Sequence, residues 1–340
     1  MPSLTSRTEL RFPAMGSDAH IIVIDGPPEL AERGRERIDQ LERRWSRFVP
    51  GSEISRLNIH AGRRLVVSDD TVLLVRRAIE AWRLTGGTFD PTVLGDVVRA
   101  GYDRSLDELP DDAPARWSPL LPGCTDITID GNEVTFPAGI GFDPGGIGKG
   151  LAADLVATEL RAAGAGAVCV NLGGDVRVSG RPDDEAGWTI AVEHPDTAEP
   201  LALVGVADGA VTTSTTLLRR WRQDGVLRHH LIDPFTGEPA DTDLELVTVI
   251  AGEAWFAEVL AKAILVRGAA HPFDLIEGAG PEALAVLTDG TVRTSPGFDA
   301  YVGDRGLPTA PVRSSTPSAT DRPHDDGRRP APERHRELVA

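Results

Sequence analysis

Short runs of apolar residues along the chain predict several β-strands. Residues 19–24 form one such run, and comparable runs occupy 167–171 and 188–192. Runs of this length, rich in β-branched residues and bounded by glycine or polar residues, are typical of buried strands. We therefore expect strands that are distributed along most of the sequence.

Apolar residues at helical spacing predict helices between these runs. The first covers about residues 29–48, and a second begins near the acidic pair at 69–70 and ends at the glycine pair at 86–87. Two more are expected at about 149–163 and 253–266. An apolar stripe marks the buried face of a helix, and a glycine after the last turn is a common end signal. The stripe of the first helix consists of Leu30, Ile38, Leu41, Trp45 and Phe48.

Two Asp-Gly pairs predict β-hairpins. Asp130-Gly131 lies in the middle of residues 127–136, and Asp289-Gly290 lies within residues 284–293. Such pairs favour the two-residue turn that joins antiparallel strands. Hairpins mixed with helices indicate an α+β fold, with a mixed, largely antiparallel sheet flanked by helices, rather than a doubly wound parallel sheet.

The composition of the chain changes near residue 304. Residues 304–340 are rich in proline, arginine and acidic residues and contain few large apolar side chains, which is typical of disorder. Neither a repeat period nor a long linker interrupts the sequence before this point. We therefore predict one domain over residues 8–303 and a disordered tail over residues 304–340.

The charge of the chain is strongly acidic. Its 340 residues include 35 Lys and Arg against 52 Asp and Glu, which gives a formal net charge of -17. This charge repels nucleic-acid backbones and anionic membranes, so neither is expected as a partner. Small molecules or proteins are the expected partners.

The sequence also lacks the signals of export or membrane insertion. Residues 1–7 contain no apolar core of a signal peptide, and no run approaches the roughly 18 apolar residues of a membrane-spanning helix. We therefore expect a cytoplasmic protein without membrane insertion.

A glycine-rich loop at residues 141–150, Gly-Phe-Asp-Pro-Gly-Gly-Ile-Gly-Lys-Gly, precedes the helix expected from 149. Backbone N–H groups in such a loop, together with the helix N-terminus, can bind phosphate. The loop is not a P-loop, because Leu151 stands where the magnesium-binding hydroxyl would be, and it lacks the Rossmann glycine spacing. Nucleotide binding and a simple tight turn both fit the pattern. Lys149 favours binding, since it is one of only two lysines in the chain.

A second candidate segment is Arg-His-His-Leu-Ile-Asp-Pro-Phe-Thr-Gly at residues 228–237. An imidazole here can act as a general base or bind a diphosphate. The alternative is a strand that ends in a turn capped by Asp233.

Two further glycine pairs follow apolar segments, in Thr-Gly-Gly-Thr-Phe-Asp at 85–90 and in Asn-Leu-Gly-Gly-Asp at 171–175. Each pair alone is more typical of an ordinary turn. Their combination with the two segments above is the informative observation.

Together these segments resemble the ApbE-type flavin transferases, which move the FMN part of FAD onto a threonine or serine of another protein. The resemblance spans about residues 12–268. Besides the segments above, its ordered motifs are Pro-Ala-Met-Gly-Ser at 13–17, Trp-Ser-Arg-Phe at 45–48, Ser-Glu-Ile-Ser-Arg-Leu-Asn at 52–58, Gly-Trp at 187–188 and Val-Thr-Thr-Ser at 211–214.

The resemblance implies roles for individual residues. His230 matches the histidine to which a catalytic role is assigned in the family. A magnesium ion on the diphosphate would be held by the backbone oxygen of Gly146 and by an Asp and a Thr four residues apart on a later helix. The residues implied to line the FAD site are Met15, Phe48, Thr88, Phe89, Asp90, Asp143, Lys149 and Ile232.

The later helix departs from the family pattern, because Glu258 stands at the Asp position and Lys262 at the Thr position. A glutamate can bind magnesium through oxygen, whereas a protonated lysine cannot be a ligand. Two interpretations stay open. Either the ammonium of Lys262 takes the place of the cation, or the two residues form an ordinary i,i+4 pair worth about 0.2–0.5 kcal/mol on an exposed helix.

The function implied is that of a transferase for protein flavinylation, which uses FAD, and Mg²⁺ where the site allows it, to modify an acceptor flavoprotein with release of AMP. Lys262 motivates two alternatives. One is an FAD-binding protein with lost or weak transferase activity, and the other is an FAD pyrophosphatase in which water replaces the acceptor.

Overall fold

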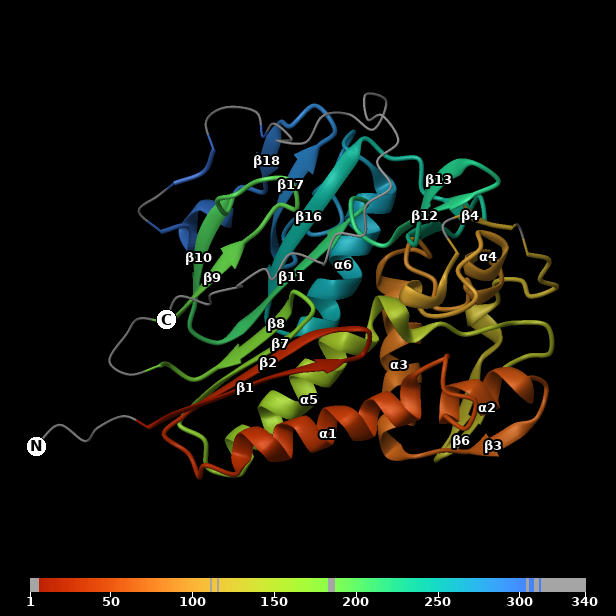
Figure 1. The fold of residues 1–340 in the computed structure, drawn as a ribbon, viewed down its shortest axis with the longest axis horizontal. Coiled ribbons are helices and arrows are strands. Elements are labelled where there is room, and N and C mark those ends of the chain that lie inside the picture. Colours follow the sequence, from red (N-terminus) through yellow and green to blue (C-terminus); the bar gives the residue numbers. More distant parts are fainter. Residues whose placement is uncertain are drawn as a thin grey trace, which may run out of the picture.

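An eight-stranded antiparallel sheet is the largest sheet of the described residues and lies mainly in the left half of Figure 1. The computed structural model describes residues 6–110, 112–114, 116–182, 187–303, 306–308 and 312. Every neighbouring pair of strands in this sheet is antiparallel. In spatial order the strands are β1 (Arg7–Ala14), β2 (Ser17–Ile24), β7 (Ala167–Leu172), β8 (Asp175–Ser179), β11 (Gly209–Thr215), β16 (Leu244–Ala251), β17 (Glu282–Leu287) and β18 (Val292–Thr294).

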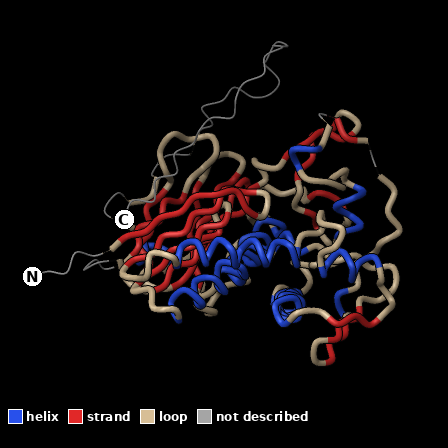
Figure 2. Tube along the Cα trace, turned by 60° about the horizontal axis from the view of Figure 1, so that its bottom comes forward, coloured by secondary structure: helices blue, strands red, loops and turns tan. Residues whose placement is uncertain are grey.

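Both faces of the sheet are buried, as strand β2 illustrates. Ile21 and Val23 belong to the apolar core on one face, whereas Ile22 and Ile24 belong to the core on the other face. Successive side chains of a strand point to opposite faces, so a sheet covered on both sides needs the continuous apolar run seen here. The helices gather on one face (Figure 2), and a small two-stranded sheet packs on the other. These covering elements are α1 (Leu30–Trp45), α5 (Gly148–Ala162), α6 (Ala254–Arg267), β9 (Trp188–Val192) and β10 (Ala202–Val206).

The remaining elements mostly lie beside the sheet, in the right half of Figure 1. They include two three-stranded sheets, of which β3, β6 and β5 form one and β13, β12 and β4 the other. The bounds are α2 (Glu53–Ile59), β3 (Arg64–Val66), α3 (Asp69–Leu84), α4 (Leu94–Arg99), η1 (Leu106–Glu108), β4 (Asp112–Ala113), η2 (Cys124–Asp126), β5 (Thr128–Asp130), β6 (Glu133–Thr135), η3 (Pro144–Gly146), β12 (Arg220–Gln223), β13 (Val226–His229), β14 (Ile232–Asp233), β15 (Glu238–Pro239) and η4 (Phe298–Tyr301).

The contact between α5 and α6 is close because residue 150 is a glycine. A Cβ atom at Gly150 would lie 2.4 Å from the backbone oxygen of Ala254, so a larger residue would push the helices apart. Asp154 fixes the same contact, since its two carboxylate oxygens accept the N–H groups of Ala254 and Trp255, each at 2.9 Å. The carboxylate thus caps the N-terminus of α6 from the neighbouring helix.

The α+β fold predicted from the sequence is confirmed, as are the predicted hairpins and the helices α3, α5 and α6. One boundary differs. The first helix ends at Trp45, because Ser46 adopts an extended conformation with φ -61° and ψ 123°. Phe48 therefore leaves the predicted apolar stripe and is partly exposed. Apart from residues 306–308 and 312, the predicted tail at 304–340 lies outside the described residues.

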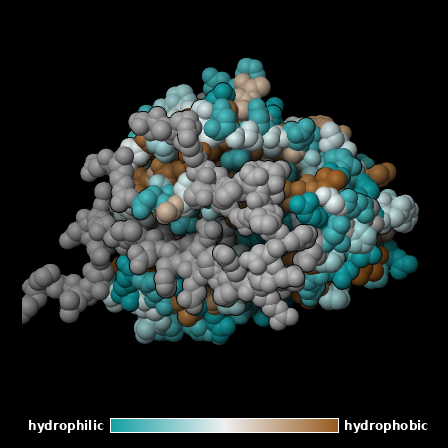
Figure 3. Space-filling view, turned by 45° about the horizontal axis from the view of Figure 1, so that its top comes forward, coloured by the Kyte–Doolittle hydropathy of each residue, from teal (hydrophilic) through white to brown (hydrophobic). Residues whose placement is uncertain are grey.

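Hydrophilic side chains cover most of the described surface on the face drawn in Figure 3, with separate apolar spots between them. Two large apolar side chains stand out by exposure, Trp117 at 84% and Phe235 at 74%. Within the described ranges, no helix has the length and apolar character needed to cross a membrane.

Candidate active site

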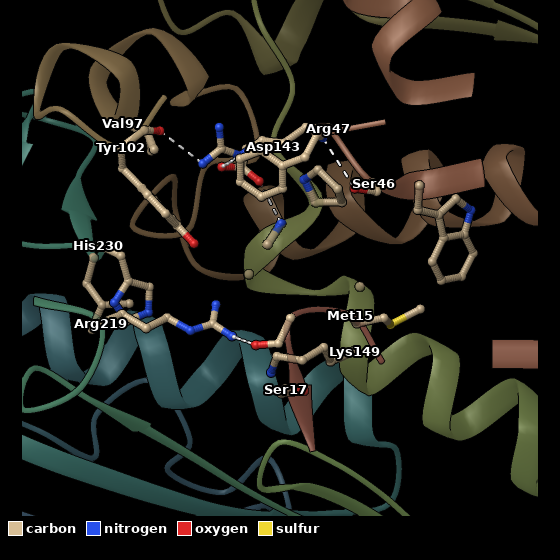
Figure 4. Close-up of a pocket in the computed structure, with 18 of the residues that line it drawn as sticks. Met15, Ser17, Ser46, Arg47, Val97, Tyr102, Asp143, Lys149, Arg219 and His230 are labelled. Atoms are coloured by element: carbon tan, nitrogen blue, oxygen red, sulfur yellow. Dashed lines mark hydrogen bonds and ion pairs between the residues drawn. The ribbon is translucent and has the colours of Figure 1, made fainter. Parts of the chain in front are cut away.

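A large cavity lies where the β1–β2 turn, the end of α1, the glycine loop before α5 and the segment after β13 meet (Figure 4). Its volume is about 1050 Å³, just above the roughly 300–1,000 Å³ typical of small-molecule sites. The cavity is thus large enough for a dinucleotide. The predicted site residues that line it are Met15, Phe48, Thr88, Phe89, Asp90, Asp143, Gly146, Lys149, His230, Ile232 and Lys262. Glu258 lies directly behind two of them.

The β1–β2 turn places Met15 at the cavity. Ala14 pairs with Ser17, so Met15 and Gly16 form a two-residue hairpin loop. Both have positive φ, at 51° and 66°, as the turn type that suits a twisted hairpin requires. A methionine in this conformation is strained, and such strain is concentrated at functional sites.

The glycine loop is held in shape by Asp143. One carboxylate oxygen of Asp143 accepts the N–H of Gly145 at 2.8 Å, and the other lies 3.1 Å from Nε of Arg47. The loop then forms η3 and leads into α5, whose first residues are Gly148 and Lys149. The N-terminus of a helix preceded by glycines attracts anions, because its N–H groups are free and the helix dipole is positive there. This part of the cavity is therefore suited to phosphate.

Aromatic side chains line the cavity near Arg47. The guanidinium of Arg47 lies 4.1 Å from the ring centre of Phe48 and 4.9 Å from that of Tyr102. Its side chain is only 7% exposed and also donates a hydrogen bond to the backbone oxygen of Tyr102 at 3.1 Å. Tyr102 in turn stacks on Trp221 with ring centres 5.3 Å apart. A flat ring system of a ligand would find stacking partners here.

Four charged side chains form a cluster below the glycine loop. Lys149 Nζ pairs with the carboxylate of Asp175 and lies 3.5 Å from Glu258 Oε1. Lys262 Nζ lies 3.0 Å from the same Glu258 oxygen. The second oxygen of Glu258 accepts the N–H of Gly150 at 2.8 Å. Asp175 and Glu258 are buried, whereas the side chains of Lys149 and Lys262 are 15% and 14% exposed at the cavity.

The charges of the cluster favour the ionised forms of Glu258 and Lys149, whereas burial and the charge of Glu258 raise the pKa of Asp175. Burial alone would raise the pKa of Glu258, but the ammonium groups of Lys262 and Lys149 outweigh it and lower the pKa. Burial alone would likewise lower the pKa of Lys149, yet the carboxylates of Asp175 and Glu258 raise it. The pair of Glu258 and Lys262 is therefore a buried ion pair and not the exposed helix pair that the sequence left open.

The residues implied to hold magnesium do not form a metal donor set. Both oxygens of Glu258 are already engaged, by two ammonium groups and a backbone N–H. Lys262 has no lone pair to donate and stands where a ligand would be needed. In the described part of the chain, no group of three or more His, Cys, Asp and Glu residues is placed to hold a metal ion.

His230 differs from the neighbouring His229 in its contacts. His229 is bonded through Nε2 to the backbone oxygen of Ala240 at 3.1 Å. His230 follows the end of β13, and its Nδ1 is buried without a hydrogen-bond partner among the described residues. Burial and the positive charges of Arg219 and Lys262 hold the pKa of His230 well below 6.5. The ring is thus neutral and able to accept a proton, as the sequence interpretation requires of a general base.

The segment from Thr85 to Asp90 forms another wall. Thr85 Oγ1 accepts the N–H of Phe89 at 3.0 Å, and Asp90 accepts the N–H of Thr92 at 2.7 Å. Burial raises the pKa of Asp90. Phe89 packs on the glycine loop, since a Cβ atom at Gly146 would lie 2.7 Å from its ring. The glycine at 146 therefore lets the loop lie against this wall.

Several polar residues at or beside the cavity were not among the predicted site residues, and three charged ones are notable for their contacts. Arg47 and Asp175 lie within the motifs of the resemblance, but only the structure reveals their pairing with Asp143 and Lys149. Arg219 has no sequence signal of its own. It has a positive φ of 51° and points across the cavity (Figure 4) to the backbone oxygen of Gly16, 3.5 Å away.

Comparison with known proteins gives a consistent result. The model of the ApbE family matches residues 15–287. An FAD:protein FMN transferase of Vibrio cholerae is 29% identical over 315 residues, which cover 89% of this chain and 92% of that protein. One from Treponema pallidum is 32% identical over 272 residues, which cover 73% and 74%.

Solved structures agree with the sequence relatives. A flavin transferase ApbE from Vibrio cholerae matches with a TM-score of 0.76 and 27% identity, over 88% of this chain and 100% of that one. The ApbE protein of Thermotoga maritima matches with a TM-score of 0.77 and 28% identity, over 87% and 99%. The family match spans the β1–β2 turn, the glycine loop, the histidine segment and helix α6, which together build the cavity described above. This chain belongs to the ApbE family.

Proposed function

We propose that this protein is an FAD:protein FMN transferase. The observation that carries the proposal is the meeting, in one large cavity, of a glycine loop at a helix N-terminus, two lysine ammonium groups and a neutral imidazole. A cavity of this kind binds a dinucleotide through its diphosphate and places a proton acceptor near it. The family and its named relatives support the same activity.

The glycine loop at one part of the cavity and the aromatic side chains at another determine the orientation of FAD. The diphosphate lies at the N-terminus of α5, against Lys149 and the loop that Asp143 shapes. The aromatic wall of Phe48 and Tyr102 offers a stacking surface for a ring of the ligand. Arg219 extends across the cavity toward the backbone oxygen of Gly16 and adds positive charge near the phosphates.

The chemical step is a phosphoryl transfer. The hydroxyl oxygen of the acceptor threonine or serine forms a bond to the phosphorus on the FMN side of the diphosphate. The bond from that phosphorus to the bridging oxygen breaks, and AMP leaves with the electron pair. His230 takes the hydroxyl proton, while the ammonium of Lys149 and the N–H groups of the loop stabilise the charge that develops on the phosphate oxygens.

We further propose that an acceptor flavoprotein is the second partner of this protein and that the protein acts in the cytoplasm. Magnesium dependence, which the family pattern implies, is not favoured, because the N–H of Gly150 and the ammonium of Lys262 already engage the carboxylate oxygens of Glu258.

The test uses the purified protein, FAD and the acceptor protein that the Vibrio cholerae relative modifies, in parallel with an acceptor whose modified residue is replaced by alanine. We expect AMP release that depends on the intact acceptor, and an acceptor mass increased by one FMN unit. AMP release with either acceptor alike would indicate the FAD pyrophosphatase. Bound FAD without AMP would indicate the FAD-binding protein, and either outcome would contradict the proposal.

A further inference from the structure

The only two lysines of this chain converge on one carboxylate at the candidate active site. Arginine supplies the other 33 of the 35 basic residues, yet Lys149 and Lys262 both line the cavity. Their Nζ atoms lie 3.5 Å and 3.0 Å from the same oxygen of Glu258. A compact ammonium differs from the planar guanidinium in acting as a point charge. The two positions thus share a geometry that favours a compact charge.

Lys262 reaches the glycine loop itself. A Cβ atom at Gly146 would lie 3.3 Å from Cδ and 3.6 Å from Cε of Lys262, so the lysine stem packs on the loop. Its ammonium sits between this loop and helix α6. Of the three N–H donors of Nζ, one points to Glu258 Oε1 at 3.0 Å and another to the Glu258 backbone oxygen at 3.5 Å. The third donor has no hydrogen-bond partner among the described residues and is left for a group in the cavity.

The charges of the cluster are arranged by depth. Glu258 and Asp175 are 0% and 1% exposed and lie behind the two lysines. The ammonium groups face the cavity, so an anion there meets positive charge first. The buried carboxylates hold the ammonium groups in place before any ligand binds, which is the arrangement that gives electrostatic stabilisation without reorganisation.

We propose that the ammonium of Lys262 binds the FAD diphosphate directly and takes the place of a divalent cation, so that this protein binds FAD without metal. The inference rests on the proposed function only in taking FAD as the ligand. Lys262 is then a catalytic residue, since it contacts the phosphate whose bond is broken. Lys262 and Lys149 each supply one positive charge that is fixed in place.

Calorimetry of FAD binding in EDTA and in excess Mg²⁺ tests the proposal without any acceptor. For the unmodified protein we expect dissociation constants that differ by less than about threefold between the two conditions. Lys262→Met keeps most of the stem but removes the charge, and we expect about 10- to 100-fold weaker binding in either condition. Arg64→Met, which removes a positive charge from the exposed strand β3, is the matched control and should leave binding unchanged.

A double variant supplies the opposite case. Glu258→Asp with Lys262→Thr restores the oxygen ligands of the family pattern, and we expect FAD binding that is weak in EDTA and recovers with Mg²⁺. Electron paramagnetic resonance with Mn²⁺ should detect a bound ion in this variant with FAD but not in the unmodified protein. Thermal unfolding checks that each variant folds. If the double variant does not fold, FAD binding by Lys262→Met tests the inference by itself.

Two results would overturn the inference. One is FAD binding by the unmodified protein that weakens tenfold or more in EDTA, and the other is unchanged binding by Lys262→Met. This inference and the proposed function can be contradicted independently of each other. Metal-free binding without transfer to any acceptor contradicts the proposed function alone, whereas transfer with metal-dependent binding contradicts this inference alone.

Discussion

Arg47 Nε lies 3.1 Å from Asp143 Oδ2, and this ion pair joins the end of helix α1 to the glycine loop 96 positions later in the chain. The pair is largely buried, with the two side chains 7% and 15% exposed. Because the other oxygen of Asp143 accepts the N–H of Gly145, the guanidinium also orients the carboxylate that shapes the loop. Arg47 is thus a positioning residue for the phosphate site.

Replacing Arg47 by methionine should loosen the loop and weaken FAD binding. Removing one partner of a buried ion pair leaves the other charge uncompensated, which costs about 3–5 kcal/mol where burial is complete and less here. We expect a rise of about tenfold or more in the dissociation constant for FAD, measured by flavin fluorescence. Arg104→Met, on an exposed arginine that pairs with its neighbour Asp103, is the control and should bind as the unmodified protein does.

His230→Gln should abolish most of the transfer activity and leave FAD binding intact. General base catalysis contributes about 10²- to 10⁴-fold, so kcat should fall by that factor. His229→Gln is the control. His229 forms a hydrogen bond with the backbone oxygen of Ala240, so its role is structural and not catalytic. A His230→Gln protein that transfers FMN at the unmodified rate would rule out the role assigned to the imidazole.

The pH dependence of kcat/KM should report the lowered pKa of His230. Burial lowers it most, and the positive charges of Arg219, Lys262 and Lys149, together with the neighbouring His229 when that ring is protonated, lower it further. A lowered pKa keeps the ring neutral at and below pH 6.5, so kcat/KM should fall only as the pH drops well below that value. Arg219→Gln removes one positive neighbour and should move this decrease to higher pH. A midpoint at 6.5 or above in the unmodified protein would contradict the assignment.

The sequence supports the prediction of the fold better than that of the site contacts. Helix α5 and its loop follow from local signals, since the glycine run and the apolar spacing are both read within about 20 residues. The end of α1 was misplaced by three residues, because an apolar Phe48 continues the stripe although its ring lines the cavity.

The contacts between distant segments could not be predicted. Lys149 was expected at the phosphate site, but its partners Asp175 and Glu258 lie 26 and 109 positions away. No local sequence pattern marks Arg219, because its positive φ is seen only in the structure and its sequence resembles that of any loop arginine. Such contacts depend on the register and packing of the sheet and helices, which no short pattern encodes.

Gly150→Ala tests whether the close contact of α5 and α6 supports the charge cluster. In an isolated helix the change would stabilise by about 1 kcal/mol. Here the new Cβ would lie 2.4 Å from Ala254 O and 2.6 Å from Ala254 C, both backbone atoms that cannot rotate away. Separating the helices to relieve this overlap costs about 1–3 kcal/mol or more, so a net loss of stability and a lower Tm are expected.

The same separation should weaken ligand binding, because the N–H of Gly150 donates to Glu258, the carboxylate that holds both lysines. Gly252→Ala is the matched control, since a Cβ atom at Gly252 would have no neighbour within 4 Å in the described part of the chain. Thermal unfolding and FAD titration of both variants decide the question. A Gly150→Ala protein as stable as the Gly252→Ala protein, with the same affinity for FAD, would show that the helix contact does not position the lysines.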